Sequence, residues 1–208
     1  MRGPQVNVRV GVLAVQGAFL AHAEILEQLG VTPVEIRQPA HLRDIDAIVL
    51  PGGESGTMSK LLVSTGLHEP LGELLTRGLP AFGTCAGMIL LASSILDGRD
   101  DQRCFGAIDI EVRRNAYGRQ VDSFEADIDT TFGQFHGVFI RAPRIETCGA
   151  GVEVLGSHRG EPVLVGQGTA LAAAFHPELS GDTRMHRFCL SHVAGLIPAE
   201  TTPTAKGQ

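Results

Sequence analysis

The chain has 208 residues, 43% of them hydrophobic, and a formal net charge of −6. This length and composition are typical of one compact α/β domain whose core needs neither disulfides nor a metal ion. A protein that follows a phosphate backbone is expected to be basic. The acidic balance and the lack of a Lys/Arg block therefore argue against nucleic-acid binding.

Two features bear on where the chain works. Its four cysteines form no Cys-x-x-Cys pair and have no zinc-finger spacing, which favours small buried thiols in a reducing compartment. Residues 2–23 superficially resemble a signal peptide, but the apolar run is diluted and the helical pattern continues through the supposed cleavage site. No stretch approaches the roughly 20 apolar residues of a membrane span. We expect a cytoplasmic protein with no cofactor, no metal and no membrane partner.

Strands and helices alternate in the first half of the chain. Continuous apolar, β-branched runs predict buried strands at 8–15, 31–36, 47–50 and 79–83. Helical spacing predicts helices at 18–29, 57–64, 70–77 and 86–96. This alternation implies a parallel sheet with helices on both faces.

The second half is richer in strands. We expect them at 105–113, 121–128, 137–140, 152–155, 162–165 and 169–175, before a closing helix at 183–195. Short strands joined by turns suggest antiparallel additions to one edge of the sheet. The predicted fold is a three-layer α/β sandwich with a mostly parallel sheet. It forms a single domain over 1–197, followed by a disordered tail over 198–208.

The segment around Cys85 has the spacing of a nucleophile elbow. Gly83-x-Cys85-x-Gly87 follows an expected buried strand and precedes an expected helix. On such a sharp turn, a bulky side chain at either glycine would collide with neighbouring backbone. The helix N-terminus favours a thiolate and offers the Ala86 N–H to an oxyanion. The alternative is a buried core cysteine beside two packing glycines.

A second motif, Phe175-His176-Pro177-Glu178, ends the last expected strand. Pro177 excludes helix and favours an extended conformation at His176, so His176 and Glu178 project to the same side. The carboxylate can then orient the imidazole, as a cysteine nucleophile requires. We predict a triad of Cys85, His176 and Glu178; a surface His-Pro-Glu turn is the alternative.

A third motif is the loop Pro51-Gly-Gly-Glu-Ser55 at the end of another expected strand. Its two glycines let backbone N–H groups face a ligand at the carboxyl edge of the sheet. We expect Gly53 to supply the second oxyanion donor, with an ordinary tight turn as the alternative. The Gly-Lys-Ser/Thr ending of a phosphate loop is absent.

The elbow and the His-Pro-Glu motif together resemble the class I, or triad, glutamine amidotransferases. Other stretches resemble the glutaminase subunits of the deoxyxylulose-independent pyridoxal 5′-phosphate synthase, over about residues 8–195. These stretches are GVLAVQGA (11–18), PGGES (51–55), RN (114–115), GRQVDSFE (118–125) and VFIRAP (138–143). The VDSFE and FIRAP stretches are the specific part, since the triad motifs fit the whole superfamily.

The resemblance implies that the substrate is L-glutamine and assigns residues to it. Gly53, Glu54 and Ser55 would line the glutamine site, and Arg114 would reach the α-carboxylate of the substrate. A guanidinium suits this task because it can pair with both carboxylate oxygens. Arg113 stands where the family often has an acidic residue. The choice between Arg113 and Arg114 therefore stays open. The alternative for Arg114 is a solvated residue at a charged strand end, with no contact to substrate.

The resemblance also implies a contact edge and a partner. Ile140 and Arg141 would contact glutamine from the antiparallel edge, and Gln16 would lie near the interface with the synthase or be a plain polar strand end. The partner would be a TIM-barrel synthase subunit that combines ammonia with a pentose phosphate and a triose phosphate. The two subunits would form a large mixed assembly, in which the glutaminase is weakly active until it docks.

Two other functions fit parts of the pattern. Another cysteine-elbow hydrolase, such as a γ-glutamyl peptidase or a glutaminase of a different pathway, would act without this synthase. A regulatory protein that keeps only the fold would be free to lose Cys85 or His176, so the intact triad argues against it. Glutamate release with and without the synthase subunit separates the three functions.

Overall fold

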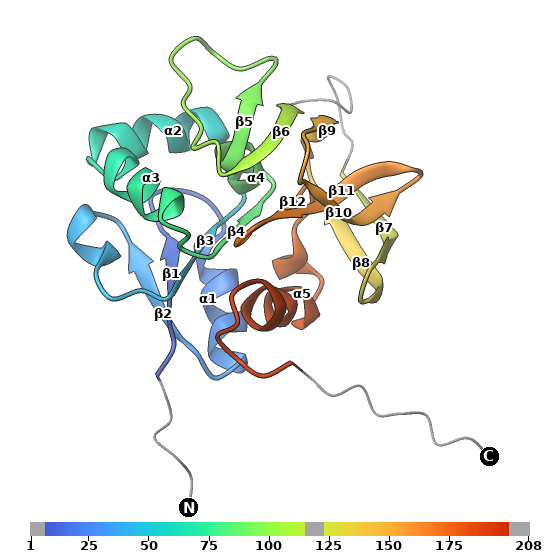
Figure 1. Cartoon of the computed structure of the whole chain (residues 1–208), viewed down its shortest axis with the longest axis horizontal. Helices are drawn as coiled ribbons and strands as arrows, with labels where there is room; N and C mark the ends of the chain where they lie inside the picture. The colour runs from blue at the N-terminus through green and yellow to red at the C-terminus, as the bar shows by residue number, and fades with distance from the viewer. Residues whose placement is uncertain (1–6, 115–122, 200–208) are drawn as a thin grey trace, which may run out of the picture.

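The computed structural model describes residues 7–114 and 123–199 of the chain. They form a central nine-stranded sheet with helices on both faces, and a second sheet of three strands (Figure 1). The strand order in the central sheet is β2-β1-β3-β4-β12-β11-β10-β7-β8. The central sheet thus has a parallel half and an antiparallel half that meet between β12 and β11.

The parallel half is the heart of the core. Its strands are β1 (Arg9–Leu13), β2 (Thr32–Ile36), β3 (Ala47–Leu50), β4 (Ala81–Thr84) and β12 (Ala170–Ala173). Every residue of β3, β4 and β12 is buried, as in a sheet that is covered on both faces. The strands expected in these regions are confirmed to within two residues at each end.

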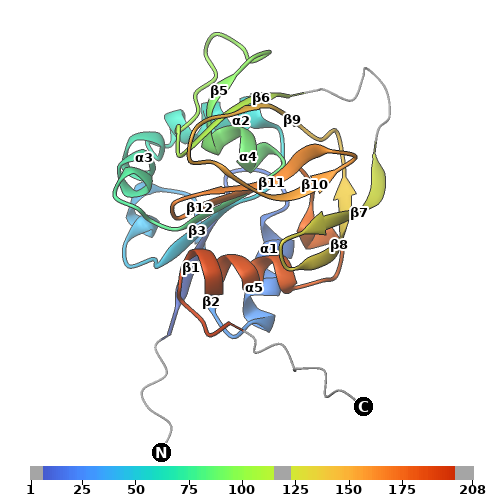
Figure 2. The ribbon, with the colours of Figure 1, turned by 45° about the vertical axis from the view of Figure 1, so that its right-hand side comes forward.

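Helices cover both faces of this sheet (Figure 2). One face carries α1 (Phe19–Gln28) and α5 (Arg184–Phe188), and the other carries α2 (Ser55–Ser64), α3 (His68–Thr76) and α4 (Ala86–Leu91). Shorter helical turns are η1 (Pro39–Leu42), η2 (Pro177–Leu179) and η3 (Cys189–Val193). The closing helix expected at 183–195 is therefore two pieces, because η3 is a π-helical segment that follows α5 directly.

The antiparallel half extends the sheet beyond β12. Its strands are β11 (Glu161–Gln167), β10 (Glu153–His158), β7 (Phe124–Thr130) and β8 (Gly133–Phe139). Each pairs with its neighbour in antiparallel register. The predicted antiparallel addition at one edge of the sheet is confirmed, but it supplies as many strand pairs as the parallel half, so the sheet is mixed rather than mostly parallel.

The second sheet corrects two expectations. It consists of β5 (Ala92–Ile95), β6 (Ile108–Arg113) and β9 (Arg144–Cys148). The helix expected over 86–96 ends at Leu91, because the following residues pair with β6 and the Ser93 hydroxyl donates to the carbonyl of Ile110 at 2.9 Å. The strand expected at 105–113 joins this sheet rather than the edge of the central one, and β9 was not expected.

Some predictions concern the ends and a loop of the chain. Residues 115–122 and 200–208 lie outside the described residues, so the start of the strand expected at 121–128 and most of the tail predicted at 198–208 are not described. The single domain predicted over 1–197 stays a prediction. No helix in the described part of the chain combines the length and the apolar character needed to cross a membrane.

Candidate active site

Cys85 occupies the sharp turn between β4 and α4. Its φ of +49° is a backbone conformation that side chains rarely adopt and that costs on the order of 1–3 kcal/mol. Flanking glycines make room for the turn. A Cβ on Gly83 would lie 2.6 Å from the carbonyl of Gly87, and a Cβ on Gly87 would overlap the carbonyl oxygen of Leu50. The strand-turn-helix geometry expected around Cys85 is present, and neither glycine tolerates a side chain without a backbone shift.

His176 follows β12 and faces the turn that carries Cys85. Its backbone N–H donates to the carbonyl of Val138 in β8 at 2.8 Å, which fixes the segment against the antiparallel half. Its Nδ1 lies 2.7 Å from Oε1 of Glu178, and Cys85, which lines the same cavity as His176, is close enough to raise the pKa of the ring. All three side chains are buried. The structure therefore connects Cys85, His176 and Glu178 in one chain of contacts.

The contacts of His176 determine its charge. Burial alone lowers the pKa of His176, but the hydrogen bonds to Cys85 and Glu178 outweigh burial and raise that pKa to about 10. The imidazole therefore holds its proton at neutral pH beside the Cys85 sulfur. A protonated imidazole next to the sulfur is the setting in which a cysteine can attack a carbonyl carbon as a thiolate.

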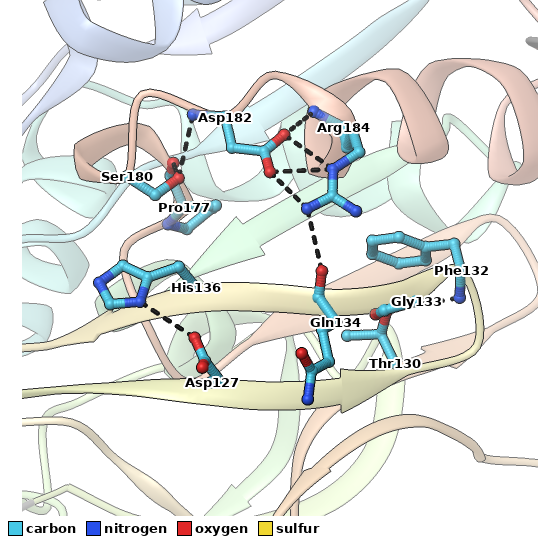
Figure 3. A network of polar contacts seen from close by, with 10 residues as sticks. All are labelled: Asp127, Thr130, Phe132, Gly133, Gln134, His136, Pro177, Ser180, Asp182 and Arg184. Atoms are coloured by element: carbon cyan, nitrogen blue, oxygen red, sulfur yellow. Dashed lines mark hydrogen bonds and ion pairs between the residues drawn. The ribbon is translucent and has the colours of Figure 1, made fainter.

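A polar network holds the turn that follows Glu178 (Figure 3). The Ser180 hydroxyl donates to the carbonyl of Pro177 at 2.8 Å, and the Asp182 N–H donates back to that hydroxyl at 3.2 Å. Arg184 donates through two nitrogens to the Asp182 carboxylate, and donates at 2.9 Å to the carbonyl of Gln134 in β8. The His-Pro-Glu segment is thus anchored to the antiparallel half on both sides.

Gly52 has a role that its place in a glycine loop does not reveal. A Cβ on Gly52 would overlap Cε1 of His176 and lie 2.9 Å from its Nδ1. The loop after β3 therefore packs directly on the imidazole. Gly52 also accepts a hydrogen bond from the Ala18 N–H at 3.1 Å, which ties the loop to the chain after β1.

A cavity of about 450 Å³ opens above Cys85. Cys85 and His176 both line it. Glu178 does not line the cavity but is hydrogen-bonded to His176. Every residue expected to contact substrate or oxyanion also lines this cavity, namely Gly53, Glu54, Ser55, Ala86, Arg114, Ile140 and Arg141. The carbonyl oxygen of Ile140 lies 3.8 Å from the Cys85 sulfur, so the antiparallel edge does reach the nucleophile.

The two candidate arginines point to different places. The Arg114 side chain is 19% exposed and lines the cavity, where it donates to Gln102 at 2.7 Å and pairs with Glu54 at 3.4 Å. The Arg113 side chain is 45% exposed and pairs with Glu146 at 3.1 Å. The geometry favours Arg114 as the cation that meets a substrate.

Glu54 and Gln16 organise the glycine loop. Glu54 is the N-cap of α2, and its carboxylate accepts hydrogen bonds from the N–H groups of Gly56 and Thr57 at 3.0 and 2.7 Å. The hydrogen bond from the Thr57 hydroxyl is the main cause that lowers the pKa of Glu54, so this group is a carboxylate. Gln16 accepts from the Glu54 N–H at 2.9 Å and packs against Gly53. Gln16 therefore supports the loop from behind rather than lining the cavity.

Comparison with known proteins agrees with this geometry. Residues 12–194 match the model of the SNO glutamine amidotransferase family. The chain belongs to this family. Proteins named pyridoxal 5′-phosphate synthase subunit PdxT resemble it over most of their length. That of Frankia alni is 53% identical over 190 residues, which cover 90% of this chain and 94% of the relative. That of Mycobacteroides abscessus is 55% identical over 186 residues, which cover 88% and 96%.

Solved structures agree with the fold of this glutamine amidotransferase. A crystal structure of a glutamine amidotransferase, 47% identical, has a TM-score of 0.85 and covers 89% of this chain and 98% of its own. The structure of PurLQS from Thermotoga maritima, at 16% identity, has a TM-score of 0.68 with 90% and 99% covered. The second likeness concerns the fold alone.

Besides Gly52, sequence reasoning missed Gln102 and His22, which touch the predicted site of this amidotransferase. Gln102 bridges Arg114 and the Ser55 hydroxyl, at 2.7 and 3.0 Å. It lies in an irregular segment with no motif, so no sequence signal marks it. His22 contacts Glu178 from α1. The sequence does mark His22. It lies three positions before Ile25 and four before Leu26, so it is a polar residue on the apolar face of the expected helix.

Proposed function

We propose that this chain is the glutaminase subunit of a pyridoxal 5′-phosphate synthase and hydrolyses L-glutamine to L-glutamate and ammonia. The observation that carries the proposal is that Cys85 and His176 line one cavity of about 450 Å³, with Glu178 holding the imidazole at 2.7 Å. The family and the names of the relatives support the substrate and the pathway.

The reaction proceeds in two stages at Cys85. The thiolate attacks the side-chain amide carbon of glutamine, and the N–H groups of Gly53 and Ala86 stabilise the oxyanion; one such donor is worth roughly 3–4 kcal/mol in other enzymes. His176 gives its proton to the departing ammonia. It then takes a proton from water, which attacks the γ-glutamyl thioester and releases glutamate with the free thiolate. Glu178 keeps the orientation of His176 through both stages and stabilises its charged form whenever the ring carries the proton.

The cavity carries charges that match the two ends of a free amino acid. The Arg114 guanidinium pairs with the α-carboxylate, and the Glu54 carboxylate accepts from the α-ammonium group. The two groups are 3.4 Å apart in this structure, so each neutralises the other until substrate enters. Ser55, Ile140 and Arg141 complete the wall of the site. This complementarity selects glutamine over a γ-glutamyl residue inside a longer peptide.

Ammonia is passed directly to a partner. In neutral water it would be protonated and lose its nucleophilicity, so a separate glutaminase would waste its product. The proposed partner is a TIM-barrel synthase subunit, which combines the ammonia with a pentose phosphate and a triose phosphate. In this proposal docking of the partner acts on the oxyanion donors through Gln16, and the contacts of Gln16 with Glu54 and Gly53 support that role.

One assay tests the proposal. Glutamate release is measured for the wild type and for Cys85→Ala, each with and without the synthase subunit. The proposal predicts release that the partner strongly stimulates and that the variant lacks. Equal release without the partner would indicate a hydrolase of another pathway, and release by Cys85→Ala would exclude the nucleophile.

A further inference from the structure

A buried polar cluster adjoins the triad on α1 and α5. His22, on α1, is completely buried. Its Nε2 lies 3.4 Å from Oε2 of Glu178 and 3.2 Å from Oγ1 of Thr84, and its Nδ1 lies 2.8 Å from Nε2 of His186 on α5. His22 thus faces the carboxylate oxygen that His176 does not use. The mechanism above gives this side chain no task.

Oε2 of Glu178 needs such a neighbour. The Glu178 side chain is 0% exposed, and within residues 7–114 and 123–199 no hydrogen bond of good geometry reaches Oε2. A buried carboxylate oxygen without a donor is costly, and its carboxyl group is free to turn. A turn would carry Oε1 away from His176. Nε2 of His22, at 3.4 Å, is placed to prevent this once its N–H points to Oε2.

The contacts of His22 select one arrangement of its protons. If Nδ1 of His22 carried the proton, its bare Nε2 would face the Glu178 carboxylate with two lone pairs opposed. In the other tautomer His186 donates from Nε2 to Nδ1 of His22, and the Nε2–H of His22 lies between Oγ1 of Thr84 at 3.2 Å and Oε2 of Glu178 at 3.4 Å. Nδ1 of His186 is then a bare nitrogen, which agrees with its having no described hydrogen-bond partner.

Both histidines of the cluster are neutral. Burial, followed by the charges of His186 and His176, lowers the pKa of His22 well below its ordinary value. Burial lowers the pKa of His186 to about 3. A neutral donor stabilises the Glu178 carboxylate without competing with His176 for the role of its cation.

We propose that His22 is a positioning residue of the glutaminase reaction: its neutral imidazole donates from Nε2 to Oε2 of Glu178 and fixes the carboxylate that orients His176. The inference rests on the proposed function, because it needs His176 to act on Cys85. The contact is long in the resting structure, and such contacts commonly shorten when the neighbouring group takes part in the reaction.

Two substitutions of nearly equal shape isolate the donor. In His22→Gln the amide nitrogen reaches the position of Nε2, whereas His22→Met fills similar space without a donor. Glutamine hydrolysis is measured in the complex with the synthase subunit. We expect His22→Met to lower kcat about 10-fold with KM within about twofold, and His22→Gln to restore most of the loss. Ile25→Val, on the same helix and in the core, controls for helix packing and keeps the wild-type kcat.

A second readout needs neither glutamine nor the partner. Iodoacetamide alkylates the full chain, and peptide mass spectrometry follows Cys85 against the exposed Cys148 as internal standard. His22→Met should slow alkylation of Cys85 about 10-fold and leave Cys148 unchanged, while His22→Gln stays near the wild type. If His22→Met does not fold, His22→Asn, whose shorter amide reaches only the position of Nδ1, takes its place.

The outcomes separate this inference from the function on which it rests. Wild-type kcat and wild-type Cys85 alkylation in a folded variant without the donor would overturn the role of His22. Equal losses in the variants with and without the donor would overturn it as well, and would indicate packing alone. A wild type that releases no glutamate with its partner would instead refute the proposed function, while the alkylation rates would still decide on His22.

Discussion

The two neighbours of the His176 ring both raise its pKa. Cys85 and Glu178 both raise its pKa against the effect of burial, to about 10. The charged imidazole in turn supports the thiolate. Reactivity at this site is therefore a property of three side chains together, and a change at Glu178 should appear in the pH dependence of Cys85 chemistry.

Glu178→Gln tests this coupling, because it keeps the shape and removes the charge. Without the carboxylate the pKa of His176 falls, so the imidazole loses its proton at lower pH than in the wild type. We expect kcat at neutral pH to fall roughly 10²- to 10⁴-fold and the alkaline limb of kcat/KM to move to lower pH. The measurement is glutamate release from pH 6 to pH 10 with the synthase subunit, and an unchanged alkaline limb would contradict the account.

Gly52→Ala tests the contact between the glycine loop and the imidazole. The added methyl group overlaps Cε1 of His176, so either the ring or the loop must move. A misplacement of about 1 Å costs on the order of 10²-fold in rate, and we expect a loss of kcat of this size. Gly72→Ala is the matched control. Its methyl group would meet Phe105 at an ordinary 3.6 Å, in a helix that prefers alanine. Equal kcat in the two variants would argue against the steric explanation.

Residue-level prediction succeeded where a motif carries its own geometry. The spacing of Gly83, Cys85 and Gly87 encodes the turn, because each glycine faces backbone that leaves no space for a Cβ. The contacts of Gln102 and the closeness of Gly52 to His176 could not be predicted in the same way. They depend on where separate segments meet, and one sequence records no such distance.

At the scale of elements, the first turn of α2 serves both stability and binding. Glu54 caps the helix through Gly56 and Thr57, and the same carboxylate lines the cavity beside Arg114. Helix N-caps are commonly occupied by short polar side chains. In the proposed function, a glutamate at this position adds a negative charge for the substrate to the capping task.

Two variants of Glu54 separate these tasks. Glu54→Ala removes both, so we expect a loss of about 1 kcal/mol in the free energy of unfolding together with a higher KM for glutamine. Glu54→Gln keeps one of the two acceptor oxygens of the cap and should retain part of the stability while KM still rises. Urea denaturation and steady-state kinetics measure the two effects. A KM that stays at the wild-type value in both variants would remove Glu54 from the binding site.

Elements were predictable where their pattern was unambiguous. Ala47–Leu50 is a strand with the bounds that its apolar run indicates. The run from Ala86 to Ala92 is apolar throughout and suits a helix or a buried strand equally, and only pairing with β6 ends the helix at Leu91. Strand β9 was missed because only Ile145 of its five residues is buried, so its alternation is too weak to see.

For the whole molecule, the two halves of the sheet divide the work. The parallel half supplies Cys85 and the glycine loop, whereas the antiparallel half supplies Ile140 and Arg141 and anchors His176 through Val138. The alternation of strands and helices predicted this division, since it placed one switch from parallel to antiparallel pairing in the second half. The separate sheet of β5, β6 and β9 could not be predicted from this alternation, because the sequence of a short strand does not show which strand it pairs with.

The central claim is that glutamine is hydrolysed through a covalent intermediate on Cys85. Acid quenching during steady-state turnover with the synthase subunit, followed by peptide mass spectrometry, tests this claim most directly. We expect a γ-glutamyl thioester on the peptide that contains Cys85, and none on the peptides of Cys104, Cys148 or Cys189. Continued turnover with the adduct on another residue, or by Cys85→Ala, would contradict it.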